Sequence, residues 1–300
     1  MTALPRAGTT ILLRSLSDLP SLASHRYRDM PFVMAPLLWS RMSGLFAKQG
    51  GLAERAHGDG IMVGYDSPEA FEEVIWRAFW PKKYHEDRIE LWDRDDYSAE
   101  AADFFRRHFR KVVLLRTGGS GRYLSKNNNN FARLALLPEM FPGAKIVVPL
   151  REPAEHAASL LRQHRNFLEQ HARDPFVKTY MSDIGHLEFG ELHRPFAFPG
   201  FEPGSLSPLE PDYWLDYWIA AYRMALAHSG SLLLLTQERV TSEPGAVMHT
   251  LCERLGLDEA GIDLAGHFKP VRRQVQDGLF DATRLAEATE LYETLRAYEI

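Results

Sequence analysis

The chain has 300 residues, of which 45% are hydrophobic and 25% charged, so it is long enough for a large core in one or two domains. Its formal net charge of -5 argues against broad nucleic-acid binding, which needs a basic face, but leaves a local basic pocket open. No apolar run approaches the roughly 20 residues that a membrane span needs, and no secretory leader is visible. The single cysteine, Cys252, excludes an internal disulfide and a cysteine-based zinc site, and favours a reducing, cytoplasmic compartment.

The first part of the chain predicts helices separated by short strands. Apolar residues at helical spacing predict helices over 8–18, 31–48, 67–80 and 98–111. Ser67 is placed to cap the third of these helices, with Pro68 at its first helical position. Short apolar runs predict strands at 19–24, 112–115 and 122–126.

The remainder alternates strands and helices more clearly. KIVVPL (145–150) and LLLLT (232–236) are unalternating apolar runs, as expected for strands buried on both faces. Helices are predicted at 131–141, 153–172, 211–228 and 243–255. This alternation predicts an α/β fold in three layers, a parallel sheet with helices on both faces. We expect one domain over 1–300, with the Pro-, Gly- and aromatic-rich segment 174–210 as an insertion or lid.

The stretch PRAGTT (5–10) places a glycine turn directly before the first helix. Unpartnered N–H groups and the helix dipole make such a turn attractive to phosphate or sulfate. The guanidinium of Arg6 can bind an oxyanion with two hydrogen bonds, and Gly8 lets the backbone approach it closely. Thr9 and Thr10 can donate hydrogen bonds from their hydroxyls. An ordinary helix start capped by a threonine explains the turn equally well.

A second element runs from strand 145–150 into the next helix through Arg151, with Ser159 eight residues later. Arg151 is expected at the carboxyl end of its strand, where open α/β sheets bind ligands. An arginine and a hydroxyl there suit a second phosphate. The alternative is that Arg151 caps a carbonyl and Ser159 lies on the helix surface.

Together these residues resemble the sulfotransferase family, which uses 3′-phosphoadenosine 5′-phosphosulfate (PAPS). PRAGTT resembles the family's 5′-phosphosulfate loop, and the strand with Arg151, Pro153 and Ser159 resembles its 3′-phosphate element. RYLSKNNNNFARLALLPEMFPGAKIVVPLREP and LLLLTQERVTSEPGAVMHTLCERLGL resemble intervening and later family segments. The sequence departs from the family pattern in two places. A first strand before the loop is almost absent, which a late start codon or a trimmed chain would explain. Asn128 stands where the family usually has a proline.

The resemblance implies a P-loop-like sulfotransferase fold and a set of binding residues. Arg6, with the backbone of Ala7, Gly8, Thr9 and Thr10, would hold the 5′-phosphosulfate, while Arg151 and Ser159 would hold the 3′-phosphate. Lys126 would reach the phosphosulfate. It also implies PAPS as donor, adenosine 3′,5′-bisphosphate (PAP) as product, no metal, and a hydroxyl or amine of a carbohydrate or other small metabolite as acceptor.

Sulfuryl transfer also needs a general base, and two loops offer one. In several branches of the family an acidic base follows the second strand, where Asp29 lies beside Arg28, a cation suited to steering an acidic acceptor. His57, beside Asp59, is the alternative, because histidine is a natural proton acceptor near neutral pH. Glu69, Glu72 and Glu73 share one predicted helix and are expected at its surface or cap.

Three functions therefore stay open. The first is a PAPS-dependent sulfotransferase. The second is a nucleotide-dependent kinase, which the missing Walker lysine–threonine pair disfavours. The third is a non-catalytic relative that keeps the fold. Late in the chain, FKPVRRQV (268–275) is either a basic loop that closes over the nucleotide or a solvated turn.

Overall fold

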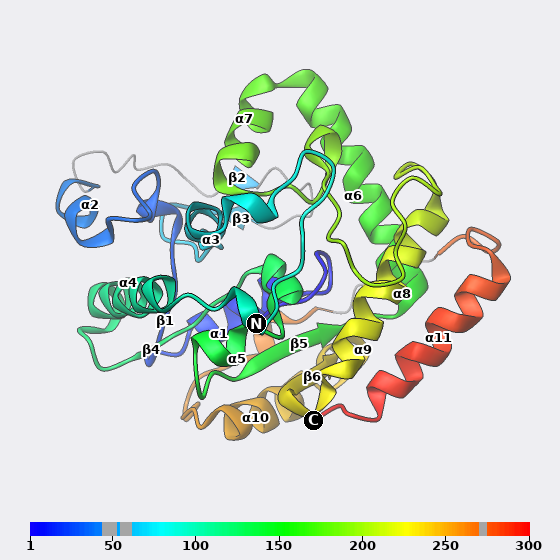
Figure 1. Ribbon diagram of the computed structural model, residues 1–300. Coiled ribbons are helices and arrows are strands. Elements are labelled where there is room, and N and C mark those ends of the chain that lie inside the picture. Colours follow the sequence, from blue (N-terminus) through cyan, green and yellow to red (C-terminus); the bar gives the residue numbers. More distant parts are fainter. Residues whose placement is uncertain (44–52, 55–61, 270–274) are drawn as a thin grey trace.

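The computed structural model describes residues 1–43, 53–54, 62–269 and 275–300 (Figure 1). Its α-helices are α1 (Thr9–Ser17), α2 (Pro36–Ser43), α3 (Glu73–Phe79), α4 (Ala99–Thr117), α5 (Leu137–Met140), α6 (Pro153–Arg173), α7 (Pro175–Ile184), α8 (Pro211–Ala227), α9 (Gln237–Ser242), α10 (Pro244–Leu255) and α11 (Ala282–Arg296). Its strands are β1 (Leu22–Ala23), β2 (Ala53–Glu54), β3 (Met62–Val63), β4 (Arg122–Tyr123), β5 (Ile146–Leu150) and β6 (Leu232–Thr236).

The parallel strands confirm the α/β class. β1 pairs with β4, and β5 pairs with β6 over five residues, from Ile146 opposite Leu232 to Leu150 opposite Thr236. Residues 1–2 lie between the two pairs, because Asn127 donates its N–H to the carbonyl of Met1 (3.3 Å) and Thr2 donates to that of Val147 (3.0 Å). The N-terminal residues therefore bridge the two pairs without forming a strand, in keeping with the near-absence of a first strand in the sequence.

Helices cover both faces of the β5–β6 pair. Side chains alternate along a strand, so Val148 and Leu234 point to one face, where they pack into a core with α6, α8 and α11. Val147 and Leu235 point to the other face and pack against α1, α9 and α10. The apolar runs are unalternating because both faces are buried, as their composition predicts.

Several boundaries differ from those predicted. VVLL (112–115) is the end of α4 rather than a strand, because the helix capped by Ser98 continues to Gly118, whose φ of 68° ends it. The helix expected over 67–80 begins only at Glu73, so Ser67 and Pro68 precede it. Residues 131–141 form the 3-10 helix η4 (Asn128–Arg133) and the single turn of α5 instead of one helix. Helix α11 was not predicted.

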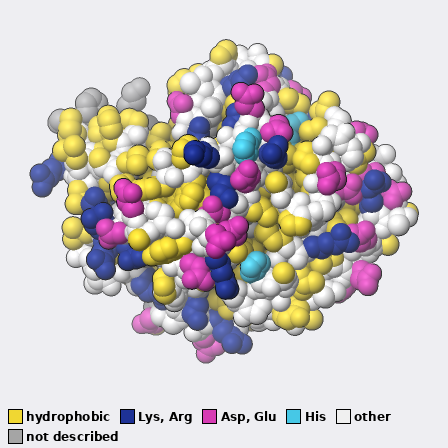
Figure 2. Space-filling model, viewed as in Figure 1, with side chains coloured by type: hydrophobic (Ala, Val, Ile, Leu, Met, Phe, Trp, Pro, Cys, Tyr) yellow, Lys and Arg dark blue, Asp and Glu magenta, His cyan; other side chains and the backbone are white. Residues whose placement is uncertain are grey.

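The two aromatic-rich stretches have different environments. Trp214, Trp218 and Tyr222 of α8 are fully buried, so that helix is core. The stretch around α2 is exposed: Phe32 is 55% and Leu38 65% accessible, and hydrophobic side chains gather over this part of the surface (Figure 2). The predicted helix over 31–48 begins at Pro36 instead of Pro31, and its last residues lie outside the described part of the chain.

The segment 174–210 is partly helical and packs onto the body of the molecule. Its helix α7 lies beside α3, and α6 runs below it to the sheet (Figure 1). Gly185, which ends α7, lies against the side chains of Glu73 and Arg77. In the described part of the chain, every helix is too short or too polar to cross a membrane.

Candidate functional site

The predicted anion loop forms a sharp turn between the sheet and α1. Arg6 and Gly8 both adopt left-handed backbone conformations, with φ of 74° and 98°. For Arg6 this conformation is strained, whereas glycine adopts it readily. Helix α1 starts at Thr9 with Gly8 as its N-cap and receives no side-chain cap. The positive end of the helix dipole and the first-turn N–H groups therefore face the turn.

The beginning of α6 holds this turn. Arg151 donates from Nη1 to the carbonyl of Arg6 at 3.2 Å, and Arg6 donates from Nε to Oγ of Ser159 at a long 3.5 Å. Arg151 and Ser159 are both nearly inaccessible to solvent. The structure thus brings together the two elements that the sequence singled out, although 145 residues separate Arg6 from Arg151.

His156, which the sequence did not single out, anchors the same turn. Its Nδ1 accepts from the indole N–H of Trp218 at 3.2 Å, so the proton is on Nε2, which donates to the carbonyl of Pro5 at 2.8 Å. Burial, with the nearby charge of Arg151, lowers the pKa of His156 to about 3. The imidazole is therefore neutral and serves as a fixed backbone clamp.

Arg151 retains capacity for an anion. Its Nη2 pairs with Glu155 at 3.2 Å, but its Nε is buried and has no hydrogen-bond partner. A buried guanidinium nitrogen without a partner is costly. An anionic group at this position would satisfy it, so the arrangement fits the predicted 3′-phosphate element.

A pocket of about 500 Å³ adjoins the turn. It lies at the carboxyl ends of β5 and β6, where Pro149 and Leu235 contribute to its wall. Gly8 and Ile11 line it from the turn and α1, and Lys269 lines it from the late basic loop. Open α/β sheets bind nucleotides at this edge. The other basic residues predicted there, Arg272 and Arg273, lie outside the described residues.

Lys126 lies in a segment that packs against the start of α1. Its neighbour Asn128 accepts from the hydroxyl of Thr9 through Oδ1 and from that of Thr2 through its carbonyl, both at 3.0 Å. Asn128, the residue that departs from the family pattern, therefore ties this segment to the turn. The ammonium of Lys126 is buried, 4.0 Å from Oε1 of Glu69.

Glu69, which the sequence analysis placed at a helix surface or cap, lies close to Lys126. It precedes α3, and its side chain is only 9% accessible. Tyr27 donates its hydroxyl to Oε2 at 2.7 Å, and the N–H of Ala70 donates to Oε1 at 2.8 Å. Burial, together with the negative charge of Glu69, raises the pKa of Tyr180 on α7 to about 12. Glu69 therefore lies close to both Lys126 and Tyr180 of α7.

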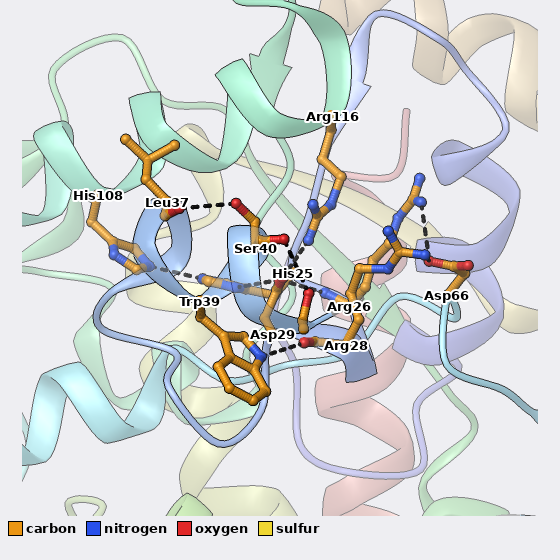
Figure 3. A network of polar contacts seen from close by, with 11 residues as sticks. His25, Arg26, Arg28, Asp29, Leu37, Trp39, Ser40, Asp66, His108 and Arg116 are labelled. Atoms are coloured by element: carbon orange, nitrogen blue, oxygen red, sulfur yellow. Dashed lines mark hydrogen bonds and ion pairs between the residues drawn. The ribbon is translucent and has the colours of Figure 1, made fainter. Parts of the chain in front are cut away.

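Asp29, the first predicted base, is buried in an ion-pair network (Figure 3). It accepts from Nδ1 of His25 at 3.1 Å, from the N–H of Arg26 at 2.9 Å and from the guanidinium of Arg116. Burial alone would raise its pKa, but the contacts with His25 and Arg116 lower the pKa to about 2. A carboxylate with so low a pKa is a weak proton acceptor, so this buried network favours a structural role for Asp29.

The second predicted base, His57, lies outside the described residues, as does Asp59. Glu72 and Glu73 are buried rather than at a helix surface, although Glu72 is the N-cap residue of α3 and Glu73 its first residue. Glu72 accepts from Tyr123 and Ser125, both at 2.9 Å. In sequence, the only signal for this burial was that both acids lie in the apolar run FEEVIW.

The described site thus combines a helix N-terminus, three basic side chains and the carboxylates of Glu69 and Glu155 near a turn that adjoins a pocket. Arg6, Arg151 and Lys126 can neutralise an anionic ligand, and Glu69 can accept a proton. Among the residues placed in the structure, no group of three or more His, Cys, Asp or Glu side chains is arranged to hold a metal ion.

Comparisons with known proteins give a family. The model described as "Sulfotransferase family" matches residues 1–193. Among curated proteins there is no match. The solved structure of sulfotransferase STF1 from Mycobacterium tuberculosis H37Rv is 14% identical, with a TM-score of 0.49 over 96% of this chain and 74% of that one. The sulfotransferase domain of the Synechococcus PCC 7002 olefin synthase is 15% identical and has a TM-score of 0.41. That match covers 100% of this chain and 94% of the other.

Proposed function

The chain belongs to the sulfotransferase family, and we propose that it transfers a sulfuryl group from PAPS to a hydroxyl or amine of a carbohydrate or other small metabolite. The observation that carries this proposal is the contact of Arg151 and Ser159 with Arg6 beside the 500 Å³ pocket. One adenine nucleotide with a phosphate at each end of its ribose can use both elements at once.

In the proposed complex, Arg6 and the first-turn N–H groups of α1 bind the 5′-phosphosulfate. Arg151, through its unpartnered Nε, and Ser159 bind the 3′-phosphate. The adenine occupies the pocket between Ile11 and Lys269.

The transfer step forms one bond to sulfur and breaks another. The acceptor oxygen or nitrogen attacks sulfur, the bond between sulfur and the bridging oxygen of the 5′-phosphate breaks, and PAP leaves. Charge grows on the leaving phosphate, where the N-terminus of α1, Arg6 and Lys126 stabilise it.

We propose Glu69, in place of Asp29, as the group that accepts the acceptor's proton. Its carboxylate lies beside Lys126, and Lys126 lies next to the segment that contacts Thr9. The alternative from sequence, His57, remains a proposal.

The test is binding of PAP, compared with adenosine 5′-monophosphate, which lacks the 3′-phosphate. A ligand at about 100 times its Kd stabilises the folded state by about 2.7 kcal/mol, which a thermal shift detects. Arg151→Ala should weaken PAP binding by about 2–5 kcal/mol, because it removes one partner of a buried charge contact. Binding of adenosine 5′-monophosphate should weaken much less, because Arg151 reaches the 5′ loop only through its contact with the carbonyl of Arg6. Retained binding of this nucleotide also shows that the variant is folded.

Three results would redirect the proposal. A loss of PAP affinity below about 0.5 kcal/mol in Arg151→Ala contradicts the 3′-phosphate assignment. Stabilisation by ATP with magnesium, but not by PAP, favours a kinase. A response to neither favours a non-catalytic protein. Once an acceptor is found, Glu69→Gln should retain PAP affinity and lower kcat about 100-fold or more, and an unchanged kcat moves the role to His57.

A further inference from the structure

A second pocket, of about 460 Å³, lies on the flank of α1 between that helix and residues 62–68. Arg14, Arg26 and Arg116 contribute to its walls, together with the polar side chains of Ser24 and Ser67. It shares Arg14 and His267 with the pocket beside the turn, so the two adjoin each other. The proposed function uses none of its three arginines.

Among the described residues around this pocket, arginine side chains outnumber carboxylates. Arg28 lies next to the pocket and, with Arg26, pairs to a single carboxylate, that of Asp66 (Figure 3). Arg116 pairs with Asp29, and Asp18 is engaged by His267 at 2.6 Å. Among the described residues, four arginines, those at 14, 26, 28 and 116, thus lie around three carboxylates, those of Asp18, Asp29 and Asp66.

The guanidinium of Arg116 provides a second, independent indication of a ligand. Its side chain is only 7% accessible, and its Nε is buried and has no hydrogen-bond partner. Burial and the neighbouring charge of Arg116 lower the pKa of Arg26, which shows that the two guanidinium groups repel each other. An anion between them would relieve this repulsion and satisfy the unpartnered nitrogen.

The pocket is close to the proposed reaction point. Arg14 follows Thr10 by four residues on α1, so it lies on the same helix face, about 6 Å further along. On the opposite wall, Pro68 directly precedes Glu69. An acceptor whose hydroxyl or amine lies between Thr10 and Glu69 can therefore extend into this pocket.

We infer that this pocket binds an anionic group of the acceptor, a carboxylate, sulfate or phosphate, and that the enzyme therefore acts on an acidic acceptor. This inference rests on the proposed function for the identity of the acceptor, but the anion site stands on its own geometry. Arg26 and Arg116 contact the anion, and Asp66 limits the affinity because it competes for Arg26.

The test measures calorimetric binding of three probes, with and without saturating PAP: glucuronate, its neutral counterpart glucose, and inorganic sulfate. We expect glucuronate to bind more tightly than both. Arg26→Gln should weaken glucuronate binding about tenfold, the loss of a charge-assisted contact. Asp66→Asn should strengthen it severalfold, a gain that damage to the fold cannot produce. Both variants should bind PAP with unchanged affinity.

Each outcome separates this inference from the proposed function. If PAP fails to bind while glucuronate affinity responds to both variants, the anion site holds and the proposed function falls. If PAP binds but glucuronate binds no better than glucose, or neither variant alters its affinity, the inference is overturned. Inorganic sulfate binding more tightly than glucuronate overturns the assignment to the acceptor and indicates a site for a free ion.

Discussion

Removing the charge of Glu73 should destabilise the protein by about 3–5 kcal/mol, the usual cost of breaking a buried ion pair. Glu73 and Arg133 form a bidentate pair with N–O distances of 2.8 and 3.0 Å, and both side chains are almost inaccessible to solvent. The guanidinium lies between the rings of Trp76 and Trp92, 4.3 and 4.2 Å from their centroids. In Glu73→Gln, Arg133 would keep a buried positive charge without the carboxylate that contacts it.

The assay is equilibrium unfolding in urea together with thermal unfolding, where the loss corresponds to a drop in Tm on the order of 10 °C. The matched control is Glu287→Gln, which breaks the solvent-exposed pair with Arg223 and should cost under about 1 kcal/mol. The double variant Glu73→Gln with Arg133→Met should recover part of the loss, because it removes the unbalanced charge. If Glu73→Gln is no more harmful than Glu287→Gln, the reasoning is wrong.

Two further predictions concern the turn and the buried histidines. Gly8→Ala should lower the free energy of unfolding by about 1–2 kcal/mol because of the φ of 98° alone, since no atom lies within 4 Å of the added methyl group. Gly8→Asn should lower it by less, because asparagine tolerates the left-handed conformation better. Equal free energies of unfolding for the two variants would refute this prediction. Burial lowers the pKa values of His108 and His156 to about 3, below the ordinary 6.5, so protonation favours the unfolded chain. The free energy of unfolding should therefore fall as the pH drops from about 6.5 towards 3, by up to about 1.4 kcal/mol per pH unit for each histidine. A midpoint of urea unfolding that stays constant between pH 6.5 and 5 would contradict this prediction.

The sequence predicted best the elements whose signals are local. The runs 145–150 and 232–236 are apolar throughout because both of their faces are buried, and they form β5 and β6. Residue type and position also predicted a glycine turn directly before α1 and Arg151 directly after β5. The run 112–115 was misassigned because two valines outweighed the helical pattern that continues into it from α4.

What the sequence could not show are pairings across long distances. Glu73 lies within an ordinary amphipathic pattern, and nothing local indicates that Arg133, 60 residues later, would pair with it. Asp29 is close in sequence to Arg26 and Arg28, but the guanidinium that pairs with its buried carboxylate is that of Arg116, 87 residues away. Charge balance in a core depends on the tertiary fold, so such roles appear only in the structure.

The strained turn explains why the two predicted elements function as one unit. A left-handed conformation at Arg6 is unfavourable and persists only where its surroundings fix it. Here His156 holds the carbonyl of Pro5, Arg151 holds that of Arg6, and Asn128 holds Thr9 at the start of α1. The groups that shape the 5′ loop thus include Arg151 itself, the proposed 3′-phosphate ligand. The turn before α1 and the start of α6 are therefore joined by direct contacts, and we expect a change at the start of α6 to disturb both elements.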